Sequence, residues 1–187
     1  MRIISGKLKG RAINFLSSET TRPLKDSVKE NIFNIILHSK FIDINIKKSK
    51  ILDLYSGIGS FGLECISRGA KEVIFVERDK KVTKILKKNL FDLSITEKVV
   101  VFEDQIENFL NKNKRHKFDI FFLDPPFADI DYLHNLKMIH KNKIYNEKHL
   151  VIIHRESKKP EDVSDILNSL LIKDYGRSKL IFGKFLR

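Results

Sequence analysis

The chain has 187 residues and a formal net charge of +12. This length predicts one domain of ordinary size with a real core, and the positive charge favours an anionic partner such as nucleic acid. Nucleotide bias in the gene would explain the preference for Lys over Arg. It explains the excess of basic over acidic residues less easily.

Several classes of protein are excluded by what the sequence lacks. A single cysteine, Cys65, cannot form an internal disulfide and is expected to lie in the core. No His and Cys residues have the spacing of a metal site, and no apolar run is long enough to span a membrane or to act as a signal peptide. We therefore expect a cytoplasmic monomer that binds neither a metal nor a membrane.

Residues 1–48 differ from the rest and are predicted to form a basic N-terminal extension. Residues 2–15 predict a glycine-turned β-hairpin, and a helix is expected over 26–39 with Asp26 as its cap. The hairpin could be an N-terminal extension without a function, but its many basic and few acidic residues favour contacts to RNA phosphates. Arg22 could instead close over a cofactor or be an ordinary surface residue. The residues predicted to contact RNA are Lys7, Lys9, Arg11, Arg22 and Lys25.

Residues 49–187 are predicted to form the main domain, in which strands and helices alternate. Strands are expected at 50–55, 72–77, 99–102, 118–123 and 150–153, with a closing hairpin at 171–175 and 179–186. Helices are expected from the glycine turn to Gly69, after the cap Asp79, at 106–110, at 130–141 and from Pro160 onward. This order predicts a doubly wound α/β fold with a mostly parallel, seven-stranded, Rossmann-like sheet and helices on both faces.

A glycine-rich turn follows the first of these strands. Gly57, Gly59 and Gly62 match the G-x-G-x-x-G spacing of dinucleotide sites, and Glu77 ends the next strand about 20 residues later, where a ribose-binding acid is expected. This match is weak by itself, and an NAD enzyme has to be considered. Asp53 argues against NAD, because a carboxylate in the cofactor cleft suits an ammonium or sulfonium group and repels a pyrophosphate.

The fourth strand ends in the most informative motif of the chain, Asp124-Pro125-Pro126-Phe127. Proline has no N–H and a fixed φ, and it keeps the preceding residue out of the helical region. The carbonyl groups of Asp124 and Pro125 are therefore held in nearly fixed directions beside an aromatic ring. Such a corner can hold a planar group that bears N–H bonds, although a plain strand-to-loop stop would show the same residues.

S-Adenosylmethionine explains both motifs, since it has a ribose, a cationic amino-acid head, a sulfonium and a methyl group to deliver. Asp104, which ends the third strand, is placed to meet the adenine amine, with helix capping as the alternative role. The residues predicted to bind this cofactor are Asp53, Tyr55, Ser56, Gly57, Gly59, Glu77, Arg78, Asp104 and Gln105. The catalytic residues, which would hold the acceptor amine, are Asp124, Pro125, Pro126 and Phe127.

Taken together, these motifs resemble the bacterial family of 16S ribosomal RNA guanine-N2 methyltransferases. The resemblance runs nearly end to end, through the basic start, residues 21–34, 52–64, 67–70 and 75–77, and the corner at 123–127. Ser5, Lys7 and Lys9 depart from the family's usual residues, although the charge is kept. The resemblance implies S-adenosylmethionine as donor and a guanine N2 amine as acceptor, guanine 966 in the family. It also implies 16S rRNA or an assembling small ribosomal subunit as partner.

Three other functions stay open. A DNA amino-methyltransferase would share the donor and the proline corner, but such enzymes usually carry a target-recognition domain for which there is no room. A non-catalytic RNA-binding assembly factor would not need an intact corner and glycine turn, and an NAD oxidoreductase is supported least. The lysines of residues 80–88 are expected to form a solvated helix face. No role is predicted for His116, His134, His140, His149 and His154.

Overall fold

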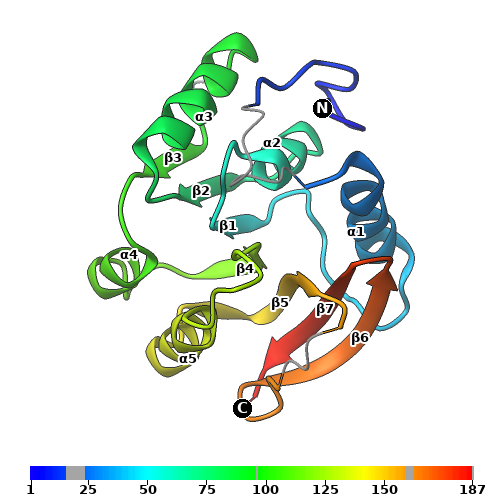
Figure 1. Ribbon diagram of the computed structural model, residues 1–187, viewed down its shortest axis with the longest axis vertical. Coiled ribbons are helices and arrows are strands. Elements are labelled where there is room, and N and C mark those ends of the chain that lie inside the picture. The colour runs from blue at the N-terminus through cyan, green and yellow to red at the C-terminus, as the bar shows by residue number, and fades with distance from the viewer. Residues whose placement is uncertain (16–23, 96, 159–161, 187) are drawn as a thin grey trace.

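The computed structural model describes residues 1–15, 24–95, 97–158 and 162–186. Within these ranges seven strands form one sheet. They are β1 (Lys50–Leu54), β2 (Glu72–Val76), β3 (Val99–Phe102), β4 (Phe118–Leu123), β5 (Tyr145–Glu156), β6 (Leu167–Tyr175) and β7 (Ser178–Phe185). Their order is β3-β2-β1-β4-β5-β7-β6 (Figure 1), with β1 to β5 parallel and β7 antiparallel to both neighbours. The predicted fold class is confirmed.

Helices cover both faces of this sheet. The described ranges contain α1 (Asp26–His38), α2 (Ser60–Ser67), α3 (Lys80–Asp92), α4 (Ile106–Lys112) and α5 (Tyr132–Asn142). The first three pack on one face, where Ile51 and Phe75 are buried, and α4 and α5 pack on the other, over Leu52 and Ile74 (Figure 1). Burial on both faces explains why the central strands are almost continuously apolar. None of these helices is both long and apolar enough to cross a bilayer.

The winding of the chain reverses between β1 and β4. Strands β2 and β3 extend the sheet from one side of β1, whereas β4 and β5 extend it from the other. In α/β proteins, ligands bind beyond the carboxyl ends of the strands at such a reversal. The fold therefore directs attention to the residues that follow β1, β2, β4 and β5.

Three of the predicted elements near the C-terminus differ from the structure. Strand β6 begins at Leu167, four residues before the predicted 171. Strand β5 is longer than the predicted 150–153 and continues to Glu156. The helix predicted from Pro160 begins outside the described residues, and residues 162–166 form no helix. Val163 and Ile166 are buried in the core beneath α5, so this segment packs as an irregular lead into β6.

The two predicted helix caps have different outcomes. Asp79 caps α3 as predicted, and its Oδ1 accepts from the N–H groups of Lys81 and Val82 at 2.7 and 3.3 Å. The lysines of this helix are exposed, as expected. Asp26 does not cap α1, because Lys25 occupies the cap position and no side chain closes the first turn.

The basic start of the chain forms the predicted glycine-turned hairpin, which is short. Among the described residues, one antiparallel bridge joins its two arms. The N–H groups of Ile4 and Ser5 donate to the carboxylate of Glu64 at 2.8 and 2.9 Å. The two N–H groups that follow Gly6 donate to Ser67. The arms are also joined to each other, since the N–H groups of Ile3, Gly10 and Ile13 donate to the carbonyls of Arg11, Ile3 and Met1 at 2.9, 2.8 and 3.1 Å.

Glu64 belongs to a buried ion cluster beneath this segment. Its carboxylate accepts from Arg68 Nε at 2.9 Å and lies 3.7 Å from Lys29 Nζ, and the side chains of Lys29 and Glu64 are fully buried. Lys29 also donates to the carbonyl of Arg2 at 2.7 Å. Burial lowers the pKa of Lys29, while Glu64 and Asp26 oppose this shift. The cluster thus joins the first residues of the chain to α1 and α2.

Replacement of Glu64 by leucine is expected to lower the free energy of unfolding by about 3–5 kcal/mol, because Lys29 would keep a buried charge without this partner. Urea denaturation followed by circular dichroism measures the change. As a control, Glu72→Gln removes a partly exposed ion pair with Lys50 and should cost at most about 1 kcal/mol. A Glu64→Leu variant as stable as the control variant would show that the cluster contributes nothing.

Candidate active site

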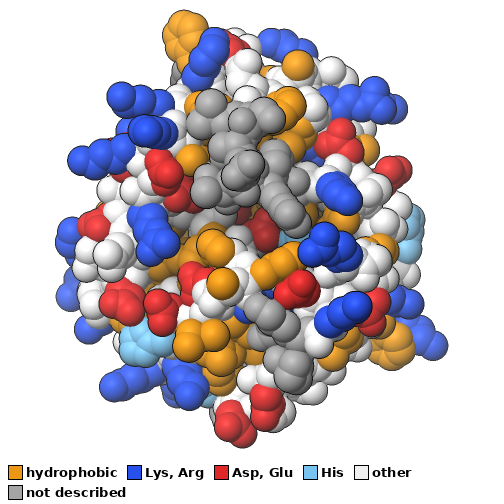
Figure 2. Space-filling model, in the orientation of Figure 1, with side chains coloured by type: hydrophobic (Ala, Val, Ile, Leu, Met, Phe, Trp, Pro, Cys, Tyr) orange, Lys and Arg blue, Asp and Glu red, His pale blue; other side chains and the backbone are white. Residues whose placement is uncertain are grey.

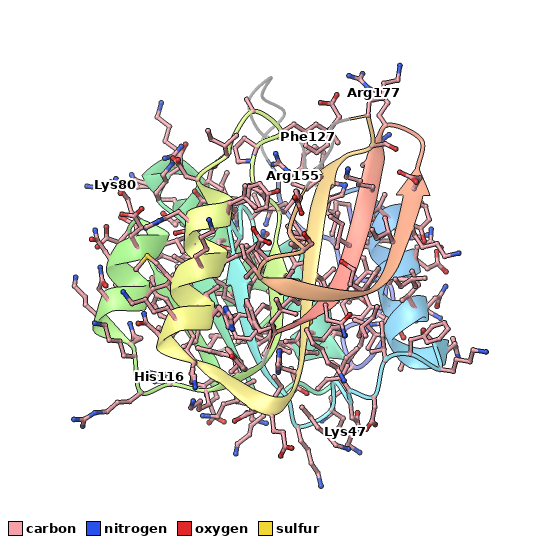
Figure 3. All side chains as sticks on the ribbon, turned by 90° about the horizontal axis from the view of Figure 1, so that it is seen from below. Lys47, Lys80, His116, Phe127, Arg155 and Arg177 are labelled. Carbon is pink, nitrogen blue, oxygen red and sulfur yellow. The ribbon has the colours of Figure 1, made fainter. Side chains whose placement is uncertain are left out.

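The ends of four parallel strands bring the predicted site residues to one edge of the sheet. Leu54 is paired with Val76 on one side and with Leu123 on the other, and Leu123 is paired with Ile153. The residues that follow these positions therefore lie side by side. Figure 3 shows Phe127 at this edge.

The glycine turn between β1 and α2 contains glycines with different surroundings. Gly57 and Gly59 have φ angles of 55° and 84°, which few other residues adopt. A Cβ on Gly59 would lie 2.4 Å from the side chain of Leu86, so packing requires this glycine. A Cβ on Gly57 would meet nothing within 4 Å. The backbone at Gly57 thus faces open space, where a ligand can approach it closely.

Two carboxylates stabilise this turn. Glu77 accepts from the N–H of Gly57 at 2.9 Å through Oε2 and from a second backbone N–H through Oε1. Asp53 is buried, and its Oδ2 accepts from the N–H of Gly62 at 2.9 Å. Burial raises the pKa of the Asp53 carboxyl well above its usual range, and the charges of Asp124 and Glu77 raise it further. A cation bound beside these acids would favour their ionised forms.

The residues on either side of the turn differ in their bonding. Tyr55 has a φ of 56°, and its hydroxyl accepts from the side chain of Asn135 in α5 at 2.9 Å. Burial raises the pKa of Tyr55. The hydroxyl oxygens of Ser56 and Ser60 are buried and have no partner in the described part of the chain. Unpaired buried hydroxyls of this kind suit a polar ligand.

The predicted residues after β2 and β3 are more accessible. Asp104 accepts from the N–H of Gln105 and from the side chain of Asn108, both at 2.7 Å, and these bonds lower its pKa. Gln105, not Asp104, occupies the cap position of α4. The side chains of Gln105 and Arg78 are exposed. Asp104 therefore stabilises the start of α4 and keeps one carboxylate oxygen, Oδ2, free of these two bonds.

The corner after β4 is held by an arginine that no sequence motif indicated. Arg155 is 2% exposed and donates to the carbonyl groups of Pro126, Phe127 and Asp129 at 3.0, 3.1 and 3.0 Å. Figure 3 shows Arg155 and Phe127 close together at this edge. The carbonyl of Pro125 accepts none of the hydrogen bonds made by the described residues. One acceptor of the corner thus remains for a ligand.

A histidine on β5 also contacts the corner. The Nδ1 atom of His154 lies 2.8 Å from Oδ1 of Asp124, and its ring meets the ring of Phe127 edge-on, with centroids 5.9 Å apart. No role was predicted for His154, because the histidines form no metal or catalytic-triad pattern in the sequence. A strand longer by one residue, in the parallel register that pairs Ile153 with Leu123, places His154 beside Asp124.

The predicted RNA-binding residues that the structure describes are at the surface. Lys7, Lys9 and Lys25 are exposed, and Arg11 is exposed while donating to a backbone carbonyl at the end of α3. Arg22 lies outside the described residues. Figure 2 shows the face toward which the strand ends point, with most of its Lys and Arg side chains around the periphery and with acidic and hydrophobic side chains both at the periphery and nearer the middle.

The residues at this edge fit S-adenosylmethionine. The carboxylates of Asp53, Glu77 and Asp124 suit a cationic ligand, the open backbone at Gly57 permits close approach, and the unpaired hydroxyl of Ser56 can bind a polar group. Within the described ranges, no three His, Cys, Asp or Glu side chains come together to hold a metal ion. The fold and this site define the class of S-adenosylmethionine-dependent methyltransferases.

Comparison with known proteins gives the family. Residues 1–184 match the model of the family described as Conserved hypothetical protein 95, so the chain belongs to that family. A ribosomal RNA small subunit methyltransferase D from Haemophilus influenzae is 37% identical over 163 residues, which cover 86% of this chain and 81% of the relative. A protein of the same name from Buchnera aphidicola subsp. Baizongia pistaciae is 32% identical over 186 residues, which cover 100% of this chain and 91% of the relative.

Solved structures agree with this assignment. A Haemophilus influenzae structure described as a methylase has a TM-score of 0.78 at 30% identity, covering 100% of this chain and 98% of the other. An Escherichia coli structure described as a methyltransferase has a TM-score of 0.82 at 25% identity, and the match covers 99% of this chain and 97% of the other. The predicted family and the predicted cofactor, S-adenosylmethionine, are confirmed.

Alanine at the two glycines should separate binding from packing. Gly57→Ala is expected to weaken binding of S-adenosylhomocysteine about tenfold or more, a loss of about 1.4 kcal/mol, because the new methyl group enters the open space. The free energy of unfolding of Gly57→Ala should fall by only about 1–2 kcal/mol, because alanine has to adopt the left-handed backbone conformation of Gly57. Gly59→Ala adds overlap with Leu86 and should cost about 1–3 kcal/mol more. Calorimetry and thermal unfolding measure both, and unchanged binding by Gly57→Ala would contradict a cofactor site there.

Proposed function

We propose that this protein transfers a methyl group from S-adenosylmethionine to the exocyclic N2 amine of a guanine in small-subunit ribosomal RNA. The observation that carries this proposal is the corner after β4. There the Asp124 carboxylate and the unpaired Pro125 carbonyl present acceptor oxygens at the same edge as the open glycine turn. The names of the relatives support ribosomal RNA as the acceptor.

The bound cofactor supplies an electrophilic methyl group, and the residues of the turn hold and orient it. Glu77 is assigned to the ribose hydroxyls, because each carboxylate oxygen has two lone pairs and only one on each is used for a backbone N–H. Asp53 contributes negative charge on the side of the cationic head. Asp104 and Gln105 are assigned to the adenine end, beyond β3.

The corner is assigned to the acceptor amine. The N2 lone pair of guanine is delocalised into the ring, so the amine is a poor nucleophile. Hydrogen bonds from its two hydrogens to Asp124 and to the Pro125 carbonyl favour a pyramidal nitrogen whose lone pair points toward the methyl group. Phe127 stacks on the base, which must first leave its own stack. Most of the acceleration then comes from positioning and fixed dipoles, and Asp124 is the nearest acceptor for the proton released.

The identity of residue 124 favours guanine over other bases. Guanine presents an N1–H beside its N2 amine, so two adjacent donors face the Asp124 carboxylate. Adenine and cytosine present a ring acceptor beside their amines, which an ionised carboxylate repels. Arg155 fixes the backbone of the corner, so the loop cannot rotate to offer a donor instead.

Asp124→Asn is expected to lower the turnover number on a guanine target by about 100-fold or more, because an electrostatic contact to the reacting amine is lost. The assay uses labelled S-adenosylmethionine with small-subunit RNA, assembled subunits, duplex DNA and matched RNAs carrying guanine or adenine at the target. Mass spectrometry identifies the product. Asp43→Asn is the control, since it changes an exposed carboxylate paired with Lys148. N6-methyladenine in RNA or DNA as the main wild-type product would overturn the proposal.

Replacement of both Lys7 and Lys9 by glutamine is expected to weaken the binding of RNA by a similar factor for all RNA sequences. Each lost phosphate contact should reduce the slope of log affinity against log salt by about 0.7–0.9. Fluorescence anisotropy at several salt concentrations measures this slope. The control replaces Lys114 and Lys141, which are also exposed. Lys114 follows α4 and Lys141 is near the end of α5, the two helices on the other face of the sheet from α2. An equal slope for the two double variants would show that the basic start does not contact RNA.

A further inference from the structure

We propose that His154 is a positioning residue for the Asp124 carboxylate and that it decides which oxygen of this carboxylate faces the acceptor amine. The inference rests on the proposed function, since it assigns a partner to the residue that would hold the amine. Neither the glycine turn nor the proline corner indicates it. It follows from the register of β4 and β5 and from the contacts of the histidine ring.

The register brings the two side chains together. Leu123 and Ile153 are paired in the parallel ladder, so the next residue on each strand, Asp124 and His154, lies at the same level of the sheet. Their side chains are 23% and 12% exposed, so water competes weakly for the hydrogen bond between them. The distance of 2.8 Å from Nδ1 to Oδ1 is that of a strong, charge-assisted bond.

The surroundings of the ring determine which of its nitrogens carries hydrogen. An ionised carboxylate only accepts hydrogen bonds, so Nδ1 of His154 must donate to Asp124. The other nitrogen, Nε2, is buried and has no partner in the described part of the chain. A hydrogen placed on Nε2 alone would leave a buried donor unpaired and would break the bond to Asp124. The tautomer with hydrogen on Nδ1 is therefore the favoured neutral form.

This arrangement fixes the orientation of the carboxylate. With Oδ1 bound to His154, Asp124 cannot rotate freely, and Oδ2 is left to accept from the amine beside the Pro125 carbonyl. The edge of the Phe127 ring packs against the histidine, so the ring assigned to the base and the carboxylate assigned to the amine share one neighbour. His154 thus acts through Asp124 and Phe127, without contacting the reacting atoms.

Two variants of His154 test the role of the hydrogen bond. His154→Leu removes the donor and keeps an apolar side chain of similar width, whereas His154→Asn keeps an N–H near the position of Nδ1. His154→Leu is expected to lower the single-turnover rate about 10- to 100-fold, because a misplaced reacting group costs this much. Asparagine should restore most of this loss. The affinity for S-adenosylhomocysteine and the KM for RNA should change less than threefold in both variants.

A double variant gives a result that a merely structural role would not produce. In Asp124→Asn, the Nδ1–H of His154 binds the amide oxygen and turns the NH2 group toward the amine, where two donors oppose each other. Removing the donor as well, in Asp124→Asn/His154→Leu, frees the amide to present its oxygen. The double variant is therefore expected to be several-fold more active than Asp124→Asn alone. Additive losses would overturn the inference, as would wild-type rates for His154→Leu.

The same assay distinguishes failure of this inference from failure of the proposed function. If wild-type protein binds S-adenosylhomocysteine but methylates no guanine in RNA or subunits, the proposed function fails, and this inference fails with it. If wild-type protein forms N2-methylguanine and His154→Leu does so at the same rate, only the role of His154 is wrong. Thermal unfolding of each variant confirms that the rates compare folded proteins.

Discussion

The parallel register of β1, β4 and β5 is the constraint on which the site depends. It pairs Leu54 with Leu123 and Leu123 with Ile153, so Asp124 and His154 emerge beside each other at the carboxyl edge. A slip of one residue would turn every side chain of a strand to the opposite face. Because the side chains on both faces of these strands are packed under helices, such a slip would disrupt the packing of both cores and is strongly disfavoured. The hydrophobic core therefore sets the distance between Asp124 and His154.

Irregular backbone beside this core needs partners, and buried cations supply them at two places. The prolines of the corner provide no N–H, and within the loop the Pro126 carbonyl accepts from the N–H of Asp129 at 2.8 Å. Arg155 donates to this carbonyl and to two others nearby. Lys29 donates in the same way to the carbonyl of Arg2, while Glu64 accepts from the N–H groups that follow. Each buried charge thus stabilises a segment that carries an assigned function, the amine corner in one case and the basic start in the other.

Local sequence was sufficient to predict the parts of the fold that have strong periodicity. Strands β1 to β4, the glycine turn and the cap Asp79 were predicted within about one or two residues, since each depends on neighbours in the chain. The candidate site residues that lie at strand ends could also be predicted, because parallel strands bring their carboxyl ends to one edge of the sheet. His154 and Arg155 were missed because their partners are about 30 residues away and become neighbours only through the β4–β5 pairing. The hairpin of the basic start was predicted from its glycines, whereas its hydrogen bonds to α2 were not, because their acceptors are about 60 residues away in the sequence.

The distribution of charge explains how one surface can serve two ligands of opposite sign. The chain is strongly basic, yet Asp53, Glu77 and Asp124 gather at the site, and their mutual repulsion contributes to the raised pKa of Asp53. Under the proposed function, these acids attract a sulfonium and repel phosphates, which leaves the RNA backbone to the basic residues of the periphery while a base turned out of its stack reaches the centre. Under the proposed function, methyl transfer also removes the positive charge from sulfur. The acids then lose a cation that offset their repulsion, which weakens the hold on the demethylated product relative to the donor. The same carboxylates that select the donor therefore favour its replacement after each turnover.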